Sequence, residues 1–456
     1  ESGHRPALAS DSAYSAKLVK LIACSEFAGN VIIRDRAWFF AELESVRILQ
    51  GLDRESLAAS LCGMLESAAD LSDAKRVLRE FRNRQMLGIL WRDICGVSDL
   101  SSTLASLSDL ADILIECTSN HVRTGLVMRF GEIVANDGRA MRLIVLAMGK
   151  LGGQELNFSS DVDLVFVYPA DGDSNGDRQL SAIEYFTRWA RQLVALLDET
   201  TEHGFVYRVD TRLRPFGDSG PLVVSLAALE AYLMQHGRSW ERYAYIKARV
   251  VGLCSDAEVA NELMEDLIRP FVYRRYLDYG IFESLREMKA LITAEVRSRE
   301  LASNIKLGPG GIREIEFIVQ SLQLVRGGAD RKLRERTLLR VLPQLAHGGG
   351  LKLAAASALG EAYRFLRRLE NFMQAIRDRQ THDLPENDVD RQRITLAMGY
   401  AEWQQLEADL QKYKTDISRQ FSEVAFRSDS NGGRSELAQR IAGLWANACE
   451  SIIVPS

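Results

Sequence analysis

Hydrophobic residues recur at the three-to-four-residue spacing of helices along most of this chain, and they alternate like strand residues only in a central part. The helical spacing fills residues 1–120 and returns in residues 256–428. One helix is predicted over residues 74–91, with Ser72 or Asp73 as its N-cap. The pattern therefore predicts an α+β protein that is mostly helical.

Polar residues refine this picture in the N-terminal part. The side of helix 74–91 opposite its apolar positions carries four arginines, which we expect to form a solvated face: Arg76, Arg79, Arg82 and Arg84. The acidic, serine-rich stretch 97–109 is expected to separate two further helices.

The alternating part lies within residues 121–255 and begins with two β-type runs, the second of which is residues 164–168. The residues between these runs include Gly152, Gly153, Ser159, Ser160, Asp161 and Asp163. Because residues two apart in a strand point to the same face, the two aspartates are expected to project together.

A helix and a third β-type run follow. The helix is predicted over residues 181–197, with an apolar face of Ile183, Phe186, Ala190, Leu193, Val194 and Leu197. The third run, residues 205–214, alternates hydrophobic with charged residues and ends at Pro215. Its charged face consists of Arg208, Asp210, Arg212 and Arg214. A strand–helix–strand order of this kind indicates an α/β unit.

Two neighbouring carboxylates repel each other unless a counter-charge lies between them, and Mg²⁺ is a hard cation that prefers oxygen ligands. Glycine backbone N–H groups and serine hydroxyls can approach a phosphate closely. A lone Asp-x-Asp is usually a solvated strand end, and a lone Gly-Gly is usually a turn. Together, between two apolar strands, they predict a metal-and-phosphate site.

Two further groups have both a structural and a functional interpretation. Asp210 is either neutralised by flanking arginines on an exposed strand or is a third metal ligand among phosphate-binding arginines. Lys247, in a predicted helix around residues 239–252, either reaches phosphate or pairs with Glu241 on the surface.

Composition excludes some classes of protein. The net charge of −5 and pI of about 5.9 argue against a general nucleic-acid binder. The six cysteines form no C-x-x-C pair, so we expect reduced thiols in a reducing cytoplasm. No uninterrupted apolar stretch approaches the length of a membrane span, and the first residues lack a signal-peptide pattern.

The segment GKLGGQELNFSSDVDLVF, residues 149–166, resembles the signature of the bacterial bifunctional glutamine synthetase adenylyltransferase/adenylyl-removing enzymes. These belong to the DNA polymerase β-like nucleotidyltransferases, in which a later strand supplies the third carboxylate. RVDTRLRPFGDSGPLV and SWERYAYIKARVVG are similar to the N-terminal, adenylyl-removing half of that family. IREIEF, with Glu314 and Glu316, also matches a family motif, although the helix dipole alone explains carboxylates in a first turn.

The resemblance implies four parts: an N-terminal helical region (1–120), a polymerase β-like nucleotidyltransferase domain (121–255), a helical bundle (256–428) and a linker toward a second half (429–456). It implies catalytic and metal-binding roles for Asp161, Asp163 and Asp210, with Mg²⁺ or Mn²⁺ as the cofactor. Nucleotide or phosphate would be bound by Gly152, Gly153, Ser159, Ser160, Arg208, Arg212, Arg214 and Lys247.

The implied reaction is phosphorolysis of AMP from adenylylated glutamine synthetase, which gives ADP and free tyrosine in the cytoplasm. The implied regulatory partner is the uridylylated PII signal protein, and no membrane or nucleic acid is involved. One alternative is a forward nucleotidyltransferase that modifies glutamine synthetase or another protein from ATP. The other is a non-catalytic scaffold that binds a nucleotide, which would have no need of three like charges.

Overall fold

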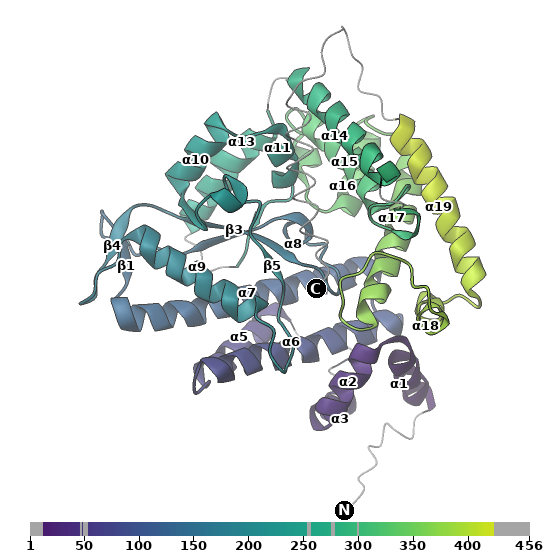
Figure 1. Cartoon of the computed structure of the whole chain (residues 1–456), viewed down its shortest axis with the longest axis horizontal. Helices are drawn as coiled ribbons and strands as arrows, with labels where there is room; N and C mark the ends of the chain where they lie inside the picture. Colours follow the sequence, from purple (N-terminus) through teal and green to yellow (C-terminus); the bar gives the residue numbers. More distant parts are fainter. Residues whose placement is uncertain are drawn as a thin grey trace, which may run out of the picture.

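The fold of the chain is given by a computed structural model, which describes residues 12–45, 48, 53–252, 257–274, 279–298 and 301–423. The predicted linker, residues 429–456, lies outside these ranges. As predicted, the protein is mostly helical, with a small mixed sheet near its centre (Figure 1).

The N-terminal part is helical, as expected. Its helices are α1 (Ser12–Cys24), α2 (Glu26–Arg34), α3 (Arg36–Glu44), α5 (Arg54–Glu66), α6 (Leu71–Ile94) and α7 (Leu100–Phe130). The N-cap of α6 is Asp70 rather than Ser72 or Asp73, because its carboxylate accepts a hydrogen bond from the backbone N–H of Asp73. Of the predicted separator 97–109, only residues 97–99 lie between two helices, α6 and α7, because α7 begins at Leu100 and runs unbroken past residue 120.

The prediction of a solvated arginine face on α6 is wrong for two of its four members. Arg79 is fully buried and donates hydrogen bonds to the backbone carbonyls of Gly204 and Leu196. Arg82 is 1% exposed and forms an ion pair with Asp378. Partners far away in the sequence therefore draw both guanidinium groups into the interior.

The main sheet is centred on β3 (Val162–Tyr168), which pairs antiparallel with β2 (Ile144–Ala147) and parallel with β5 (Val209–Asp210) and β6 (Val223–Ser225). On the far side of β2 lies β7 (Arg249–Val250), also antiparallel. A separate antiparallel pair joins β1 (Ile133–Ala135) to β4 (Gly172–Ser174).

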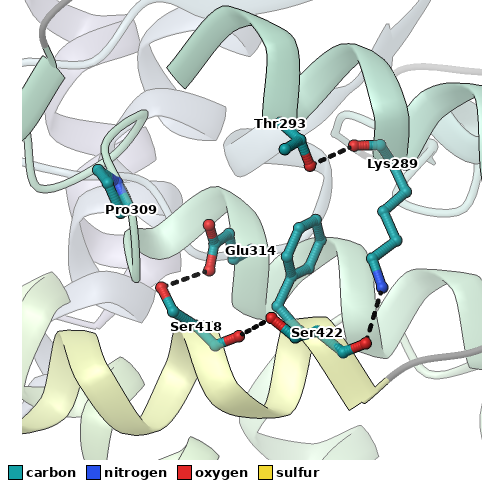
Figure 2. A pocket seen from close by; sticks show the side chains of 7 residues that line it. Lys289, Thr293, Pro309, Glu314, Ser418 and Ser422 are labelled. Atoms are coloured by element: carbon teal, nitrogen blue, oxygen red, sulfur yellow. Dashed lines mark hydrogen bonds between the residues drawn. The ribbon is translucent and has the colours of Figure 1, made fainter. Parts of the chain in front are cut away.

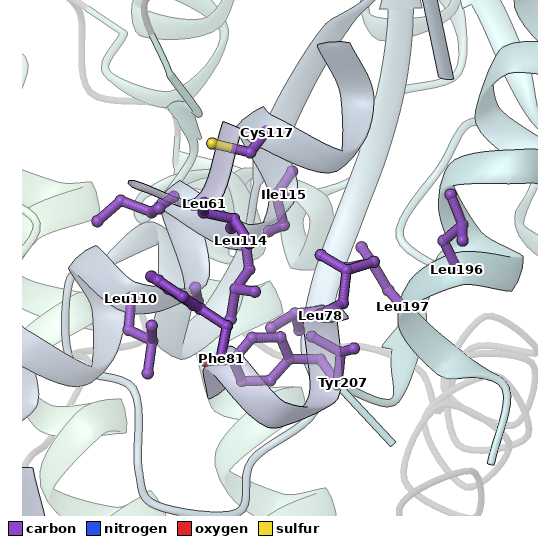
Figure 3. Packing of buried hydrophobic residues seen from close by; sticks show 14 of the residues in the cluster. Leu61, Leu78, Phe81, Leu110, Leu114, Ile115, Cys117, Leu196, Leu197 and Tyr207 are labelled. Carbon is purple, nitrogen blue, oxygen red and sulfur yellow. The ribbon is translucent and has the colours of Figure 1, made fainter. Parts of the chain in front are cut away.

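Alternate residues of β2 and β3 enter two different hydrophobic cores, one on each face of the sheet. Leu164 and Phe166 belong to the core shared with the N-terminal helices, while Val165 and Val167 belong to the core shared with the C-terminal helices. Figure 3 shows side chains of α5, α6 and α7 meeting those of α9 (Ala182–Asp198) in the first core. The sheet is thus held between two helical regions.

Helix α9 was predicted with nearly the right bounds. A capping box between Ser181 and Glu184 begins it. Ile183, predicted to be buried, is 41% exposed, whereas Tyr185 and Trp189 are buried and widen the apolar face.

The rest of the chain is again helical. Its α-helices are α10 (Leu226–Gln235), α11 (Ser239–Tyr245), α12 (Ala257–Asn261), α13 (Arg269–Val272), α14 (Tyr279–Ser298), α15 (Ile312–Arg326), α16 (Leu338–His347), α17 (Leu353–Ala375), α18 (Asp388–Met398) and α19 (Trp403–Glu423). A π-helical segment covers Glu262–Ile268, and single 3₁₀ turns cover Gly217–Ser219, Leu301–Ser303 and Arg331–Arg334.

Helix α17 connects this bundle to the N-terminal helices. Its last residue, Ala375, accepts a hydrogen bond from the hydroxyl of Ser25, which also caps α2. The backbone N–H of Phe27 donates to the carbonyl of Ile376. The end of α17 is therefore fixed against the beginning of α2.

Candidate active site

Two aspartates predicted to share a site lie opposite each other on adjacent strands. Asp163 of β3 is paired with Asp210 of β5, and Val162 is paired with Val209, in a parallel register. The ten-residue strand predicted over 205–214 is wrong, because only Val209 and Asp210 are strand. The Asp210 carboxylate accepts a hydrogen bond from the backbone N–H of Arg212, and this local turn ends the strand.

The electrostatics of Asp163 reflect this crowding. Burial raises the pKa of Asp163 to about 7, and repulsion from Asp210 and Asp161 contributes to the same shift. Lys306 and Arg212 act in the opposite direction. A carboxylate that two others repel in this way fits a site for a divalent cation, which would relieve the repulsion.

Arginines engage the other two aspartates. The Nε of Arg208 donates to Asp161 at 2.6 Å, and Arg212 makes a bidentate contact with Asp210. Over the described part of the chain, no three carboxylate, imidazole or thiol groups form a ready-made metal cage. A cation at the aspartates would therefore exchange with these guanidinium groups.

Arg214, the third predicted arginine, has a different environment. Its guanidinium donates at 2.9 Å to both the carbonyl and the hydroxyl of Thr211, and also to the carbonyl of Gly220. Arg214 therefore braces the turn that follows Asp210.

The predicted glycine pair is packed against protein. A Cβ on Gly152 would lie 2.1 Å from the carbonyl oxygen of Lys247, and one on Gly153 would lie 3.1 Å from the Lys247 side chain. The glycine beside the carboxylates is Gly149, which opens the short helix α8 (Gly149–Gly152) at φ +53°. A Cβ there would lie 2.3 Å from Oδ2 of Asp163, so only glycine fits.

The two predicted serines lie in the loop that leads to Asp161, and both are buried. The backbone of Ser159 is held on both sides, because its N–H donates to Gln374 at 2.9 Å and its carbonyl accepts from Arg208 at 2.9 Å. The hydroxyl of Ser159 has no hydrogen-bond partner among the residues that the structure describes. The same atom is buried, so a ligand would reach it only after neighbouring side chains move.

Lys247 is neither exposed nor paired with Glu241. Its ammonium lies 3.1 Å from carboxylate oxygens of both Glu155 and Glu316. Burial alone would lower the pKa of Lys247, but attraction by Glu316 and Glu155 raises it above its usual value. Glu241 instead accepts hydrogen bonds from the Tyr232 hydroxyl and the backbone N–H of Arg238.

The family motif IREIEF divides between two environments. Glu316 belongs to the ion pair with Lys247. Glu314 lines a different, open pocket of about 210 Å³, where the hydroxyl of Ser418 donates to it at 3.3 Å (Figure 2). Lys289 and Ser422, from α14 and α19, also line this pocket.

The chain is similar in sequence to proteins of a known family. A family model described as glutamate-ammonia ligase adenylyltransferase matches residues 15–264, more than half of the sequence. The chain belongs to this family. A second model, GlnD PII-uridylyltransferase, matches residues 286–425.

Curated members of the adenylyltransferase family are similar over most of this chain. A bifunctional glutamine synthetase adenylyltransferase/adenylyl-removing enzyme from Thioalkalivibrio sulfidiphilus is 45% identical over 434 residues, which are 94% of this chain and 44% of that protein. One of the same name from Xanthomonas campestris is 49% identical over 347 residues, covering 76% and 37%. The chain thus spans less than half the length of these relatives.

Two contributors to the site of this adenylyltransferase-family chain were missed in the sequence. Gln380 donates to Oδ2 of Asp161 at 3.1 Å, and attraction by the Lys306 ammonium partly offsets the rise in the pKa of Asp163. Both residues lie in the range that matches the second family model. Neither belongs to a local pattern around the aspartates, so only the folded chain reveals them.

Within the described ranges, no helix is both long and apolar enough to cross a membrane.

Proposed function

We propose that this chain removes AMP from adenylylated glutamine synthetase by phosphorolysis. The observation that carries the proposal is the parallel pairing of Asp163 with Asp210. Asp161 lies two residues before Asp163 and accepts a hydrogen bond from Arg208, and Asp210 accepts hydrogen bonds from Arg212. Phosphoryl transfer requires positioning and neutralisation of charge, which such an arrangement supplies.

The direction of the reaction rests on the sequence. RVDTRLRPFGDSGPLV and SWERYAYIKARVVG resemble the adenylyl-removing half of the family. In phosphorolysis an oxygen of inorganic phosphate forms a bond to the AMP phosphorus, and the bond between that phosphorus and the tyrosine oxygen breaks. The products are ADP and the tyrosine side chain.

The residues of the chain have distinct roles in this proposal. Asp161, Asp163 and Asp210 would hold Mg²⁺ or Mn²⁺. The cation would neutralise phosphate charge and help a phenol with a free pKa of about 10 to leave as phenolate. Phosphate is already anionic at neutral pH, so these carboxylates need not act as a strong base.

The arginines bind the anionic groups. Arg208 and Arg212, once exchanged from the aspartates, would contact phosphate oxygens bidentately. Ser159, whose buried hydroxyl has no partner among the described residues, would donate to the AMP group once neighbouring side chains uncover it. Ser160 belongs to the proposed phosphate cradle, whereas we leave Gly152 and Gly153 out of it, because their backbone N–H groups donate to the carbonyls of Met148 and Gly149. We assign Lys247 and Arg214 to bracing the site, because their charged groups are engaged by protein.

The proposal extends to partners and location. Glutamine synthetase is the protein substrate, the uridylylated PII protein is the regulatory partner, and the reaction takes place in the cytoplasm. The match of residues 286–425 to a PII-uridylyltransferase model supports a link to PII signalling.

The test is to incubate the chain with adenylylated glutamine synthetase, phosphate and Mg²⁺ and to identify the product. We expect ADP and unmodified tyrosine, and no ADP with Asp161→Asn. Pyrophosphate formed from ATP and unmodified glutamine synthetase would instead indicate the forward reaction. Nucleotide binding without product under any metal would indicate a scaffold.

A further inference from the structure

Helix α17 carries a buried stripe of polar side chains. Arg367, Glu370, Asn371 and Gln374 have the i, i+3, i+4, i+7 spacing of one helix face, and none is more than 1% exposed. Burying four such groups is unfavourable unless each has a partner. Their partners therefore reveal what the stripe does.

The partners of the stripe follow one another along the loop before Asp161. Arg367 donates to the carbonyl of Glu155 and to the side chain of Asn157. Glu370 accepts from the Asn157 amide at 2.8 Å.

The next two positions of the stripe bind the backbone of the loop, and Asn371 also donates to the side chain of Asp93 at 3.0 Å. Asn371 accepts from the backbone N–H of Phe158 at 2.8 Å, and Gln374 accepts from that of Ser159 at 2.9 Å. The stripe therefore aligns with residues 155–159 in sequence order, one helix residue for almost every loop residue.

The chain continues this contact beyond α17. Asp378 has a left-handed backbone, φ +52°, and forms an ion pair with the buried Arg82 at 2.6 Å. Two residues later Gln380 donates to Asp161. Arg82 of α6 thus anchors the segment that reaches the first aspartate.

We propose that α17 is a positioning element for the aspartates, with Gln374 as its decisive residue. Gln374 fixes the N–H of Ser159 while Arg208 fixes its carbonyl, so the peptide groups on both sides of Ser159, two residues before Asp161, are clamped. Helix α17 lies in the range that matches the second family model, whereas the aspartates lie in the range that matches the first. Residues of the second range therefore complete the site that contains the aspartates. The catalytic part of this inference rests on the proposed function, whereas the clamp itself does not.

The experiment compares Gln374→Met with Gln374→Glu in the full chain. Both substitutions keep the size of the side chain, but only glutamate keeps the oxygen that accepts from Ser159. The Nε2 of Gln374 has no hydrogen-bond partner among the described residues, so its loss removes no donated bond. Arg364→Gln, on the exposed face of the same helix, is the matched control.

Two measurements separate positioning from simple stability. Hydrogen exchange at the Ser159 amide reports the clamp without any substrate, and kcat and KM report catalysis. We expect Gln374→Met to speed Ser159 exchange at least tenfold and to lower kcat by about 100-fold with little change in KM for phosphate. Gln374→Glu should recover most of both losses, and Arg364→Gln should change neither.

Unchanged Ser159 exchange in folded Gln374→Met would overturn the clamp. Faster exchange with an unchanged kcat would overturn the positioning role. If wild-type protein forms no ADP, the proposed function fails, while the exchange measurement still tests the clamp. If Gln374→Met does not fold, Gln380→Leu replaces it as the test, because Gln380 lies on a partly exposed segment. Gln380→Leu removes the hydrogen bond to Asp161 and must therefore lower kcat. An unchanged kcat in Gln380→Leu would also overturn the proposal.

Discussion

Asp163 and Asp210 face each other across two parallel strands, although a whole helix and a loop separate them in the sequence. This pairing places two carboxylates at one point of the sheet. Asp161, the residue just before β3 begins at Val162, lies close enough to repel Asp163. Arg208 binds the carboxylate of Asp161, and Arg212 binds that of Asp210. The pKa of Asp163, which lies between them, is raised.

The raised pKa of Asp163 predicts how stability depends on pH without metal. The pKa is about 7 in the folded protein against a model-peptide value near 3.8, so the folded state binds this proton more tightly. This tighter proton binding adds on the order of 4 kcal/mol to the unfolding free energy. The stabilisation is fully present below about pH 4 and is lost as pH rises to about 7. Thermal unfolding of wild-type protein and Asp163→Asn between pH 4 and 8 measures it.

In that experiment the Asp163→Asn protein should lack most of the pH-dependent loss, because an amide does not ionise. Added Mg²⁺ should stabilise wild-type protein chiefly above pH 6. Parallel pH curves for the two proteins would contradict the raised pKa.

A methyl group at residue 149 should disrupt the site more than its size suggests. In Gly149→Ala the new Cβ would meet Asp163 at 2.3 Å. We expect a loss of about 1–3 kcal/mol from overpacking and about 100-fold in kcat from displacement of the carboxylate. Gly138→Ala is the matched control, since Gly138 also has a positive φ but a Cβ there meets open space. Equal effects on kcat would refute the contact.

Lys247 should behave as a structural residue. Replacing it by methionine removes the ammonium that contacts both Glu155 and Glu316, and Glu316 keeps only the weaker attraction of Arg367 and Lys150. We therefore expect a loss of about 3–5 kcal/mol in unfolding free energy. The double variant Lys247→Met/Glu316→Gln should recover part of it. Chemical denaturation provides both values. A stable Lys247→Met protein with a strongly raised KM for phosphate would restore the phosphate-binding role instead.

Arg208 should affect metal binding and phosphate binding in opposite directions. Arg208→Gln removes the guanidinium that occupies Asp161, so Mg²⁺ should bind a few-fold more tightly. The same change removes a phosphate contact, so KM for phosphate should rise roughly tenfold or more. Mg²⁺ titration followed by thermal shift, together with steady-state kinetics, tests both. Weaker Mg²⁺ binding would contradict the exchange between cation and arginine.

Local patterns predicted much of the fold. The apolar periodicity located α9, and the two β-type runs predicted around the Gly-Gly and Asp-x-Asp residues are β2 and β3. Periodicity succeeds here because these elements bury a continuous apolar face. The mostly helical character of both flanking regions followed from the same signal.

Errors arose where distant partners override local chemistry. Arg79 and Arg82 have the pattern of a solvated face, but backbone carbonyls and Asp378 bind them inside the protein. Residues 205–214 alternate like a strand, yet Asp210 ends the strand by capping its own turn. Lys247 has buried acidic partners on other elements. The residues that neighbour these positions in the sequence do not indicate such pairings.

The most direct test of the central claim follows the label from [³²P]phosphate, supplied with Mg²⁺ and adenylylated glutamine synthetase, in wild-type protein and in Asp210→Asn. We expect label in the β-phosphate of ADP with wild type. In the variant we expect labelling to fall about 100- to 1,000-fold, as when one charge-stabilising group is lost, while its far-ultraviolet circular dichroism stays unchanged. Unlabelled or absent ADP with wild type, or undiminished labelling with Asp210→Asn, would contradict it.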